Sequence, residues 1–463
     1  MAILLLVSGR HLFETARGAE PTAAKDPPQS MFFQARGLKS QWDTWLYYHQ
    51  GTYYLYILAG AGGNWDGIAM ADSPDGVHWT DRGLVLRKAD GVTWLGTGST
   101  WKSPRFDRDK KYFLNFSEWR GDRQTIFFAA SSDLLHWNRL GKEYEFKQDE
   151  RWYQPEGRWD CIWTIPRPGG GLLGYWTATP KPETGGRFGF GQTSDGVKWQ
   201  ALPPPKVEGA GEGEVGAIEK IGGQYYMLFG TGGKMVTLLA DRPEGPFRAA
   251  TTNREVLSGN TYFARFFPTP DGLLVNHHTI AANGQVYFAP LKRAFVDQAG
   301  VLRLIWWWGN GQLKQEDVAL QVPATAAGPR AEMLPDTLDA SRGLVLEGTL
   351  TVPTDKAGSV GLYLEHAAKA GVAILVRPGG VTEFGPMQQD GSHFKPESRV
   401  DRQAAFAGAA TFRLLLKGSL FEFYLNDHLM QCWRLPGRAT GRIGLIRPQP
   451  AAIRGLKAWY SRP

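Results

Sequence analysis

The sequence has very few cysteines: Cys161 and Cys432 are the only two in 463 residues. Two thiols cannot build a disulfide framework or a cysteine-based zinc site. Stability therefore has to come from a packed core, and a chain of this length can bury a large one. One disulfide between distant parts of the chain is the only covalent link left open.

Long apolar runs, blocks of like charge and a 3.6-residue apolar period are also absent. No segment after the N-terminus is apolar over the roughly 20 residues that a membrane-spanning helix needs. The net charge of +7 is spread along the chain, which indicates a solvated surface and no nucleic-acid arm. The missing helical period argues against a mainly helical fold.

The N-terminus begins MAILLLVSGRHLF, a short apolar run without the basic residues that precede it in a signal peptide. The stretch up to residue 28 is rich in Ala, Thr, Glu and Pro. We interpret residues 1–28 as an export-like or disordered segment, which predicts a secreted or periplasmic protein.

Aromatic residues and glycines are abundant, with 18 Trp and 57 Gly. Aromatic segments joined by glycine-containing turns are typical of β-hairpins, as in LYYHQGTYYLYI at residues 46–57. Three similar segments end in Asp-x-x-x-Trp, and a looser fourth copy ends in Phe. They are ADSPDGVHW (71–79), ASSDLLHW (130–137), QTSDGVKW (192–199) and LADRPEGPF (239–247).

This repeat predicts small sheets arranged in an array, and a ring of four-stranded sheets is a β-propeller. The spacing gives five blades between residues 29 and 320, with WWWGNGQLK (306–314) as the strand that closes the ring. The alternative is one large sandwich with coincidental turns. Residues 335–463 contain further alternating segments and predict a C-terminal β-sandwich, so the expected fold is all-β throughout.

Three acidic residues precede predicted inner strands of blades one, three and four: Asp43, Asp160 and Glu214. In a closed ring all three can face one pocket, and such carboxylates suffice for glycoside hydrolysis. Each could instead be a structural turn residue. Glu212 and Glu219 compete with Glu214, and Glu156 competes with Asp160, so these alternatives stay open.

Four tryptophans are predicted to bind substrate by stacking on sugar rings, although any of them could be blade core: Trp42, Trp45, Trp101 and Trp119. Arg158 is predicted to bind a sugar hydroxyl or to keep Asp160 ionised. One residue of the His277-His278 pair should face the channel. No cofactor and no metal are expected, and a structural ion near His278 is the less favoured alternative.

The motifs around the acids are WDTWLYYHQGTYYLY, RWDC and EVGAIEKIGGQYYML. With them the sequence resembles the five-bladed propeller glycoside hydrolases of families 32 and 43, the invertase/levanase and arabinanase/xylosidase group. The resemblance implies that Asp43 is the nucleophile or base, that Glu214 is the acid, and that Asp160 assists them.

The two families share the features of this chain unequally. The hairpin after Asp43 is similar to family 43, whereas RWD and the sandwich with SLFEFYLNDHLMQCW are similar to family 32. The family 32 motif Asn-Asp-Pro-Asn-Gly is absent, and Cys161 stands where Pro is usual. RWD and the sandwich favour retention of anomeric configuration, and the hairpin favours inversion; we predict retention.

The expected function is therefore a glycosidase that acts as a monomer on an oligo- or polysaccharide, a furanoside or a related plant or microbial glycan. No nucleic acid and no membrane are expected as partners. Two alternatives stay open: a carbohydrate-binding propeller without catalysis, and a glycoside phosphorylase of similar fold. The first would bind sugars without cleaving them, and the second would depend on phosphate.

Overall fold

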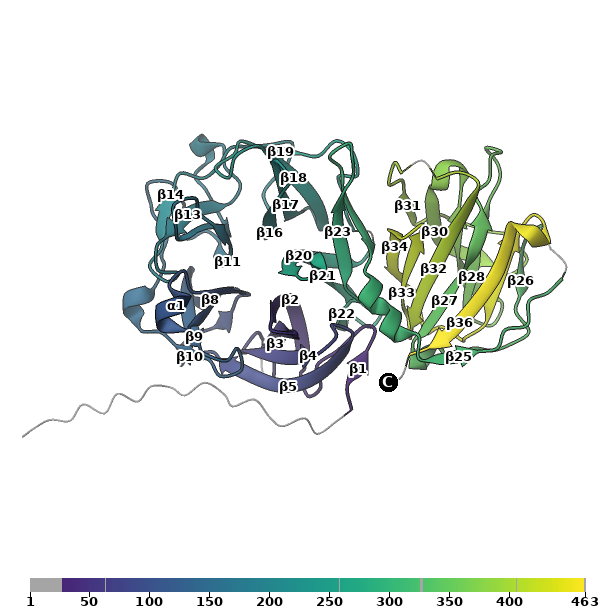
Figure 1. The fold of residues 1–463 in the computed structure, drawn as a ribbon, viewed down its shortest axis with the longest axis horizontal. Coiled ribbons are helices and arrows are strands. Elements are labelled where there is room, and N and C mark those ends of the chain that lie inside the picture. The colour runs from purple at the N-terminus through teal and green to yellow at the C-terminus, as the bar shows by residue number, and fades with distance from the viewer. Residues whose placement is uncertain (1–26, 63, 258, 325–327, 405, 462–463) are drawn as a thin grey trace, which may run out of the picture.

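The structure is a computed structural model that describes residues 27–62, 64–257, 259–324, 328–404 and 406–461. Most of the predicted N-terminal segment, residues 1–26, lies outside the described residues. Figure 1 shows a ring of small sheets on one side and two packed sheets on the other. The predicted fold class, a five-bladed propeller followed by a sandwich, is confirmed.

Each blade is an antiparallel sheet whose first long strand lies innermost, except that blade two begins with two short strands. Blade one contains β2 (Ser40–His49), β3 (Thr52–Gly60), β4 (Gly67–Ser73), β5 (His78–Arg87) and β1 (Gln29–Ser30). Blade two contains β6 (Trp94–Leu95), β7 (Ser99–Lys102), β8 (Tyr112–Arg120), β9 (Arg123–Ser131) and β10 (Asn138–Arg139). Blade three contains β11 (Trp159–Pro166), β12 (Leu172–Ala178), β13 (Gly189–Thr193) and β14 (Gln200–Leu202).

The last two blades carry extra strands. Blade four contains β16 (Glu214–Ile221), β17 (Gln224–Thr231), β18 (Lys234–Ala240), β19 (Phe247–Ala249) and β15 (Val207–Glu208), which pairs in parallel with β19. Blade five contains β20 (Thr261–Thr269), β21 (Gly272–Ile280), β22 (Val286–Phe288), β23 (Lys292–Val296) and β24 (Leu302–Trp306).

The sandwich consists of two six-stranded groups around a core of aliphatic and aromatic side chains. One group contains β34 (His428–Arg434), β33 (Leu420–Leu425), β32 (Ala409–Lys417), β27 (Leu344–Thr351), β36 (Ile453–Tyr460) and β25 (Glu316–Val318). The other contains β26 (Gly328–Met333), β35 (Ile443–Arg447), β28 (Val360–Ala367), β29 (Ala370–Val376), β30 (Thr382–Gln388) and β31 (Ser398–Val400). β25 and β26 lie before residue 335, so sandwich strands start earlier than the predicted boundary.

Helices are few and short. The only α-helix in the described part of the chain is α1 (Phe106–Asp109), and no described helix has the length or apolar character to span a membrane. Six short 3-10 segments make up the rest of the described helices: η1 (Lys142–Tyr144), η2 (Pro182–Thr184), η3 (Trp308–Leu313), η4 (Ala340–Arg342), η5 (Pro378–Gly380) and η6 (Pro450–Ala452).

The repeated Asp-x-x-x-Trp segments are turns between the outer strands of blades one to three. In blade two, Ser131 Oγ accepts from the backbone N–H of Asp133 and Leu134, and Asp133 Oδ1 accepts from that of Leu135 and His136. Asp75 and Asp195 make equivalent bonds in their blades. The repeat that revealed the propeller is therefore structural, since its acids hold turns and do not face the channel.

The ring is closed by the N-terminal segment. β1 pairs with the outer strand β5 of blade one, and Phe33 pairs with Phe288 of blade five. The prediction that residues 306–314 form the closing strand is wrong, because β24 ends at Trp306 and residues 308–313 form η3.

A buried polar cluster joins propeller and sandwich. Lys292 of β23 forms an ion pair with Glu422 of β33, and Tyr424 donates to Glu422 at 2.7 Å. His277 of β21 lies 3.6 Å from the same carboxylate, and all four residues of the cluster are fully buried. Both cysteines are buried and free, so no disulfide links the two parts.

Candidate active site

The three predicted acids lie at the starts of innermost strands, Asp43 on β2, Asp160 on β11 and Glu214 on β16. The structure brings them together. A single guanidinium nitrogen, Nη2 of Arg158, lies 2.8 Å from Glu214 Oε1 and 3.5 Å from Asp160 Oδ2. The charges of Glu214 and Asp160 both act on Asp43, so the three carboxyl groups share one site.

Each of these strands carries a β-bulge beside its acid. The register shifts between Trp42 and Thr44 on β2, after Asp160 on β11, and between Val215 and Ala217 on β16. A bulge adds one residue, bends the strand and changes the direction of the local side chains. The bulges thus turn polar residues of otherwise aromatic strands toward the channel.

The backbone groups that the bulges release from the ladder are bound by side chains of the preceding blade. Asn115 of blade two binds the N–H and C=O of Ile162 in blade three. Thr177 of blade three accepts from Val215 N in blade four, and Asn276 of blade five donates to the carbonyl of Thr44 in blade one. These bonds fix the acids relative to one another, because each one ties an acid-bearing strand to its neighbouring blade.

Asp160 is fixed by hydrogen-bonded side chains of blade two. Ser117 donates to Asp160 Oδ1 at 2.7 Å, and Gln124 donates to Ser117 Oγ at 2.8 Å. Gly96 lies close to the same carboxylate: a Cβ atom at this position would be only 2.6 Å from Asp160 Oδ1. Burial raises the pKa of Asp160, whereas Arg158 and the Ser117 hydroxyl oppose that rise.

Arg158 lies beside Asp160, where its charge opposes the rise in the pKa of that acid, and it also pairs with Glu214. Burial by itself would lower the pKa of Arg158, but the neighbouring carboxylates of Asp160 and Glu214 raise it overall. Its side chain is 43% exposed, so it can still contact a ligand.

Arg265 is a second cation of the site, and sequence reasoning missed it. It is fully buried on β20, donates to the carbonyl of Gly98 and to Cys161 Sγ, and its charge acts on both Asp43 and Asp160. An arginine within the aromatic strand TYFARFF is the signal that could have identified it. Three carboxyl groups therefore share the charge of two guanidinium groups.

Asp43 lies deeper than Glu214 and is 7% exposed. Burial and the negative charge of Glu214 raise the pKa of Asp43 well above its ordinary value, and Arg265 opposes them. Oδ1 of Asp43 has no hydrogen-bond partner, and Nδ1 of His278 lies 3.8 Å from it. The imidazole ring of His278 packs against Trp42, with the ring centres 4.5 Å apart.

Beside Glu214 lies a cavity of about 590 Å³, formed by loops of blades three and four and by Tyr262 of blade five. Arg158, Gln154, Thr179 and Arg187 supply polar groups to its wall. Burial and the Glu214 carboxylate raise the pKa of Tyr262, a site residue that sequence reasoning did not predict. Of the three predicted acids, Glu214 is the one that lines this cavity.

The four predicted tryptophans divide into two pairs. Trp42 and Trp119 are half-buried, and Trp119 stacks on Trp94 with ring centres 5.0 Å apart. Trp45 is 0% exposed and donates to Thr100, and Trp101 is 4% exposed and donates to the carbonyl of Gly196. The prediction that Trp45 and Trp101 are stacking platforms is wrong, because both side chains are buried in the core between blades.

The competing acids occupy different positions. Glu212 is exposed and lines the same cavity as Glu214, and Glu156 is exposed on a loop. Glu219 lies at the far end of β16, in a separate cavity of about 420 Å³, where burial raises its pKa to about 7. Of these acids, Glu214 is the one that contacts Arg158.

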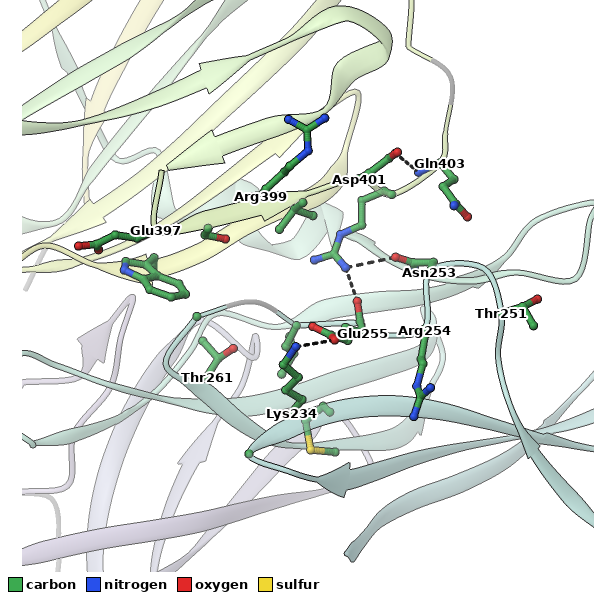
Figure 2. Close-up of a pocket in the computed structure, with 18 residues that line it drawn as sticks. Lys234, Thr251, Asn253, Arg254, Glu255, Thr261, Glu397, Arg399, Asp401 and Gln403 are labelled. Carbon is green, nitrogen blue, oxygen red and sulfur yellow. Dashed lines mark hydrogen bonds and ion pairs between the residues drawn. The ribbon is translucent and has the colours of Figure 1, made fainter. Parts of the chain in front are cut away.

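The described residues contain no group of three or more His, Cys, Asp and Glu arranged to hold a metal ion. Another cavity, of about 540 Å³, lies between blade four and the sandwich. Figure 2 shows Lys234 and Glu255 of the propeller on one side of it and Arg399 and Asp401 of the sandwich on the other. Asp43, Asp160 and Glu214 are not part of its lining.

No family model and no curated protein matches the sequence. Solved structures do match its fold. Sucrose-6-phosphate hydrolase from Lactobacillus gasseri has 13% identity and a TM-score of 0.70, covering 94% of this chain and 93% of that one. A variant of fructan 1-exohydrolase IIa from Cichorium intybus, in complex with 1-kestose, has 14% identity and a TM-score of 0.70, covering 94% and 97%.

A glycoside hydrolase of family 32 from Bifidobacterium adolescentis is similar as well, with 13% identity and a TM-score of 0.64, covering 94% of this chain and 81% of that one. The similarity extends through both the propeller and the sandwich. By fold, this chain is similar to the family 32 group of five-bladed propeller glycoside hydrolases with a C-terminal sandwich.

Proposed function

We propose that this protein is a glycoside hydrolase that cleaves a furanoside by means of Asp43, Asp160 and Glu214. The observation that carries the proposal is the convergence of these three carboxyl groups, from three blades, around Arg158. The solved structures of similar fold include enzymes named for sucrose 6-phosphate and for fructan, which makes β-fructofuranosides the first substrates to test.

The exposure of the acids suggests their roles. Glu214 is the most exposed of the three and lines the cavity, so it is placed to protonate the oxygen of the leaving group. Asp43 lies deeper and would attack the anomeric carbon. Asp160, bound by Ser117 and close to Arg158, would accept hydrogen bonds from sugar hydroxyls.

The reaction then has two steps. In the first, a bond forms between an Asp43 oxygen and the anomeric carbon while the glycosidic bond breaks and Glu214 transfers its proton to the leaving oxygen. In the second, Glu214 takes a proton from water, which attacks the same carbon and releases Asp43. This sequence retains the configuration, and proton NMR of the first product tests it against inversion.

Glu214 must carry a proton before the first step. In the unliganded site it forms an ion pair with Arg158, and three carboxyl groups face two guanidinium groups. One proton on the three carboxyl groups makes the set electrically neutral. We infer that a sugar hydroxyl displaces Arg158 from Glu214, and that the shared proton then moves from Asp43 to Glu214.

The test is turnover of aryl β-fructofuranoside, aryl α-arabinofuranoside, sucrose and 1-kestose by the wild type and by the Asp43→Asn variant. Cleavage that disappears in the variant supports the proposal. Binding of these sugars without cleavage would favour a carbohydrate-binding propeller, and turnover that requires phosphate would favour a phosphorylase. Secretion and a monomeric state stay predictions, to be tested by cell fractionation and by sedimentation.

A further inference from the structure

His278 is a buried titratable residue for which the proposed mechanism has no use. It lies on β21 and is 0% exposed, yet neither of its ring nitrogens has a hydrogen-bond partner. Buried polar atoms without partners are rare in folded proteins and call for an explanation. Oδ1 of Asp43, which lies on β2, has no partner either.

These unpartnered atoms are complementary. A neutral imidazole carries one N–H that can donate, and an ionised carboxylate only accepts. Nδ1 of His278 and Oδ1 of Asp43 are 3.8 Å apart, about 0.6 Å beyond the usual hydrogen-bond range. A small rotation of either side chain would satisfy both atoms, and the Trp42 ring packs on the imidazole with its centre 4.5 Å from that of the imidazole.

We propose that His278 is a positioning residue for Asp43: its neutral imidazole donates from Nδ1 to Oδ1 and holds the ionised carboxylate toward the channel. The proposal rests on the proposed function of Asp43. It predicts that the hydrogen bond forms when Asp43 loses its proton.

The protonation states agree with this geometry. Burial, together with the neighbouring His277, lowers the pKa of His278 to about 3, so the ring is neutral over the range in which Asp43 titrates. A neutral ring can donate without adding a charge. The other groups that act on Asp43 are Glu214 and Asp160, which raise its pKa, and Arg265 and Arg158, which lower it.

His277 supplies a matched control. It is the adjacent residue, it is equally buried, and its side chain points to the opposite face of β21, where it lies 3.6 Å from Glu422 of the sandwich. Burial lowers the pKa of His277 too. A general disturbance of β21 should therefore affect the His277 and His278 variants alike, whereas the proposed bond involves His278 alone.

The first experiment is the pH profile of kcat/KM for His278→Leu, His278→Asn and His277→Leu. Loss of a hydrogen bond to an ionised group should move the acid limb of His278→Leu upward by about one pH unit. Asn can place its amide nitrogen near the position of Nδ1, so the acid limb of the kcat/KM profile of His278→Asn should stay within about 0.3 pH unit of that of the wild type. His277→Leu should leave it in place.

A second measurement does not depend on catalysis. The Asp43 carboxyl carbon, assigned by comparison with Asp43→Asn, can be titrated by carbon-13 NMR in the wild type and in His278→Asn and His278→Leu. An upward shift in His278→Leu alone supports the proposal even if no glycoside is cleaved, which would count only against the proposed function. Equal titration in all three proteins, or equal shifts in both His278 variants, would overturn it.

Discussion

The substitution Gly96→Ala, which adds one methyl group and removes no polar atom, should lower kcat/KM. A Cβ at Gly96 would lie 2.1 Å from Ser117 Oγ and 2.6 Å from Asp160 Oδ1, where ordinary contact begins at 3.4 Å. Both side chains must move by about an ångström, because the Gly96 backbone has no positive φ and fits alanine without strain. The hydrogen bond from Ser117 to Asp160 would then break.

The size of the effect follows from that bond. A hydrogen bond to a charged group contributes about 1.5–3 kcal/mol, which corresponds to roughly a 10- to 150-fold loss in kcat/KM. The assay is kcat/KM of Gly96→Ala on the best furanoside of the wild type, with circular dichroism to check folding. Gly223→Ala is the control, because a Cβ there meets no atom within 4 Å.

A double-mutant cycle tests whether loss of the hydrogen bond from Ser117 to Asp160 accounts for the lower kcat/KM. Ser117→Ala removes the same hydrogen bond from the other side, so the losses of Gly96→Ala and Ser117→Ala should not multiply in the double variant. Multiplicative losses would mean that the methyl group acts elsewhere. Retention of activity within threefold by Gly96→Ala would refute the argument that Ser117 and Asp160 are held in one tight arrangement.

Three further outcomes are expected. Glu214→Gln should lower turnover of natural glycosides by about 10²–10⁴-fold and spare aryl glycosides with good leaving groups; equal losses on both would deny it the role of acid. Glu422→Ala should lower the free energy of unfolding in urea by about 3–5 kcal/mol, because it leaves the buried Lys292 without its ion-pair partner. Glu255→Ala, which removes an exposed ion pair, should lower it by at most about 1 kcal/mol. Asp43→Asn should have a higher melting temperature than the wild type, and the difference should grow as pH rises above about 4. The reason is that the raised pKa of Asp43 makes its ionisation destabilising in the folded state. A difference in melting temperature that is constant with pH, or negative, would contradict this.

The architecture could be predicted because its signals are local. The turn segments recur in sequence, and their Asp side chains bind backbone groups within three residues, so pattern and structure coincide. The ring closure was missed for the opposite reason. It depends on pairing of Phe33 with Phe288, a contact over a long stretch of chain that no local pattern records.

The two wrong tryptophans show where strand alternation fails. In a regular strand, Asp43 and Trp45 are two residues apart and point to the same face. The bulge between Trp42 and Thr44 interrupts that alternation, so Asp43 faces the channel while Trp45 packs between blades against Tyr56. A bulge of this kind depends on a side chain from another blade, here Asn276, and so is not visible around residue 43.

The three acids and Arg158, which the structure brings together, could be selected from the sequence as candidates, whereas Arg265 could not. Carboxylates are conspicuous where they interrupt aromatic strands, as Asp43 and Asp160 do. Arg265 and His278 interrupt such strands as well, yet a buried arginine or histidine reads equally well as a satisfied core residue. Both residues act on acids of other blades: the charge of Arg265 lowers the pKa of Asp43 and of Asp160, and His278 Nδ1 lies 3.8 Å from Asp43 Oδ1. Because Arg265 and His278 belong to strands of blade five, these contacts exist only in the assembled ring.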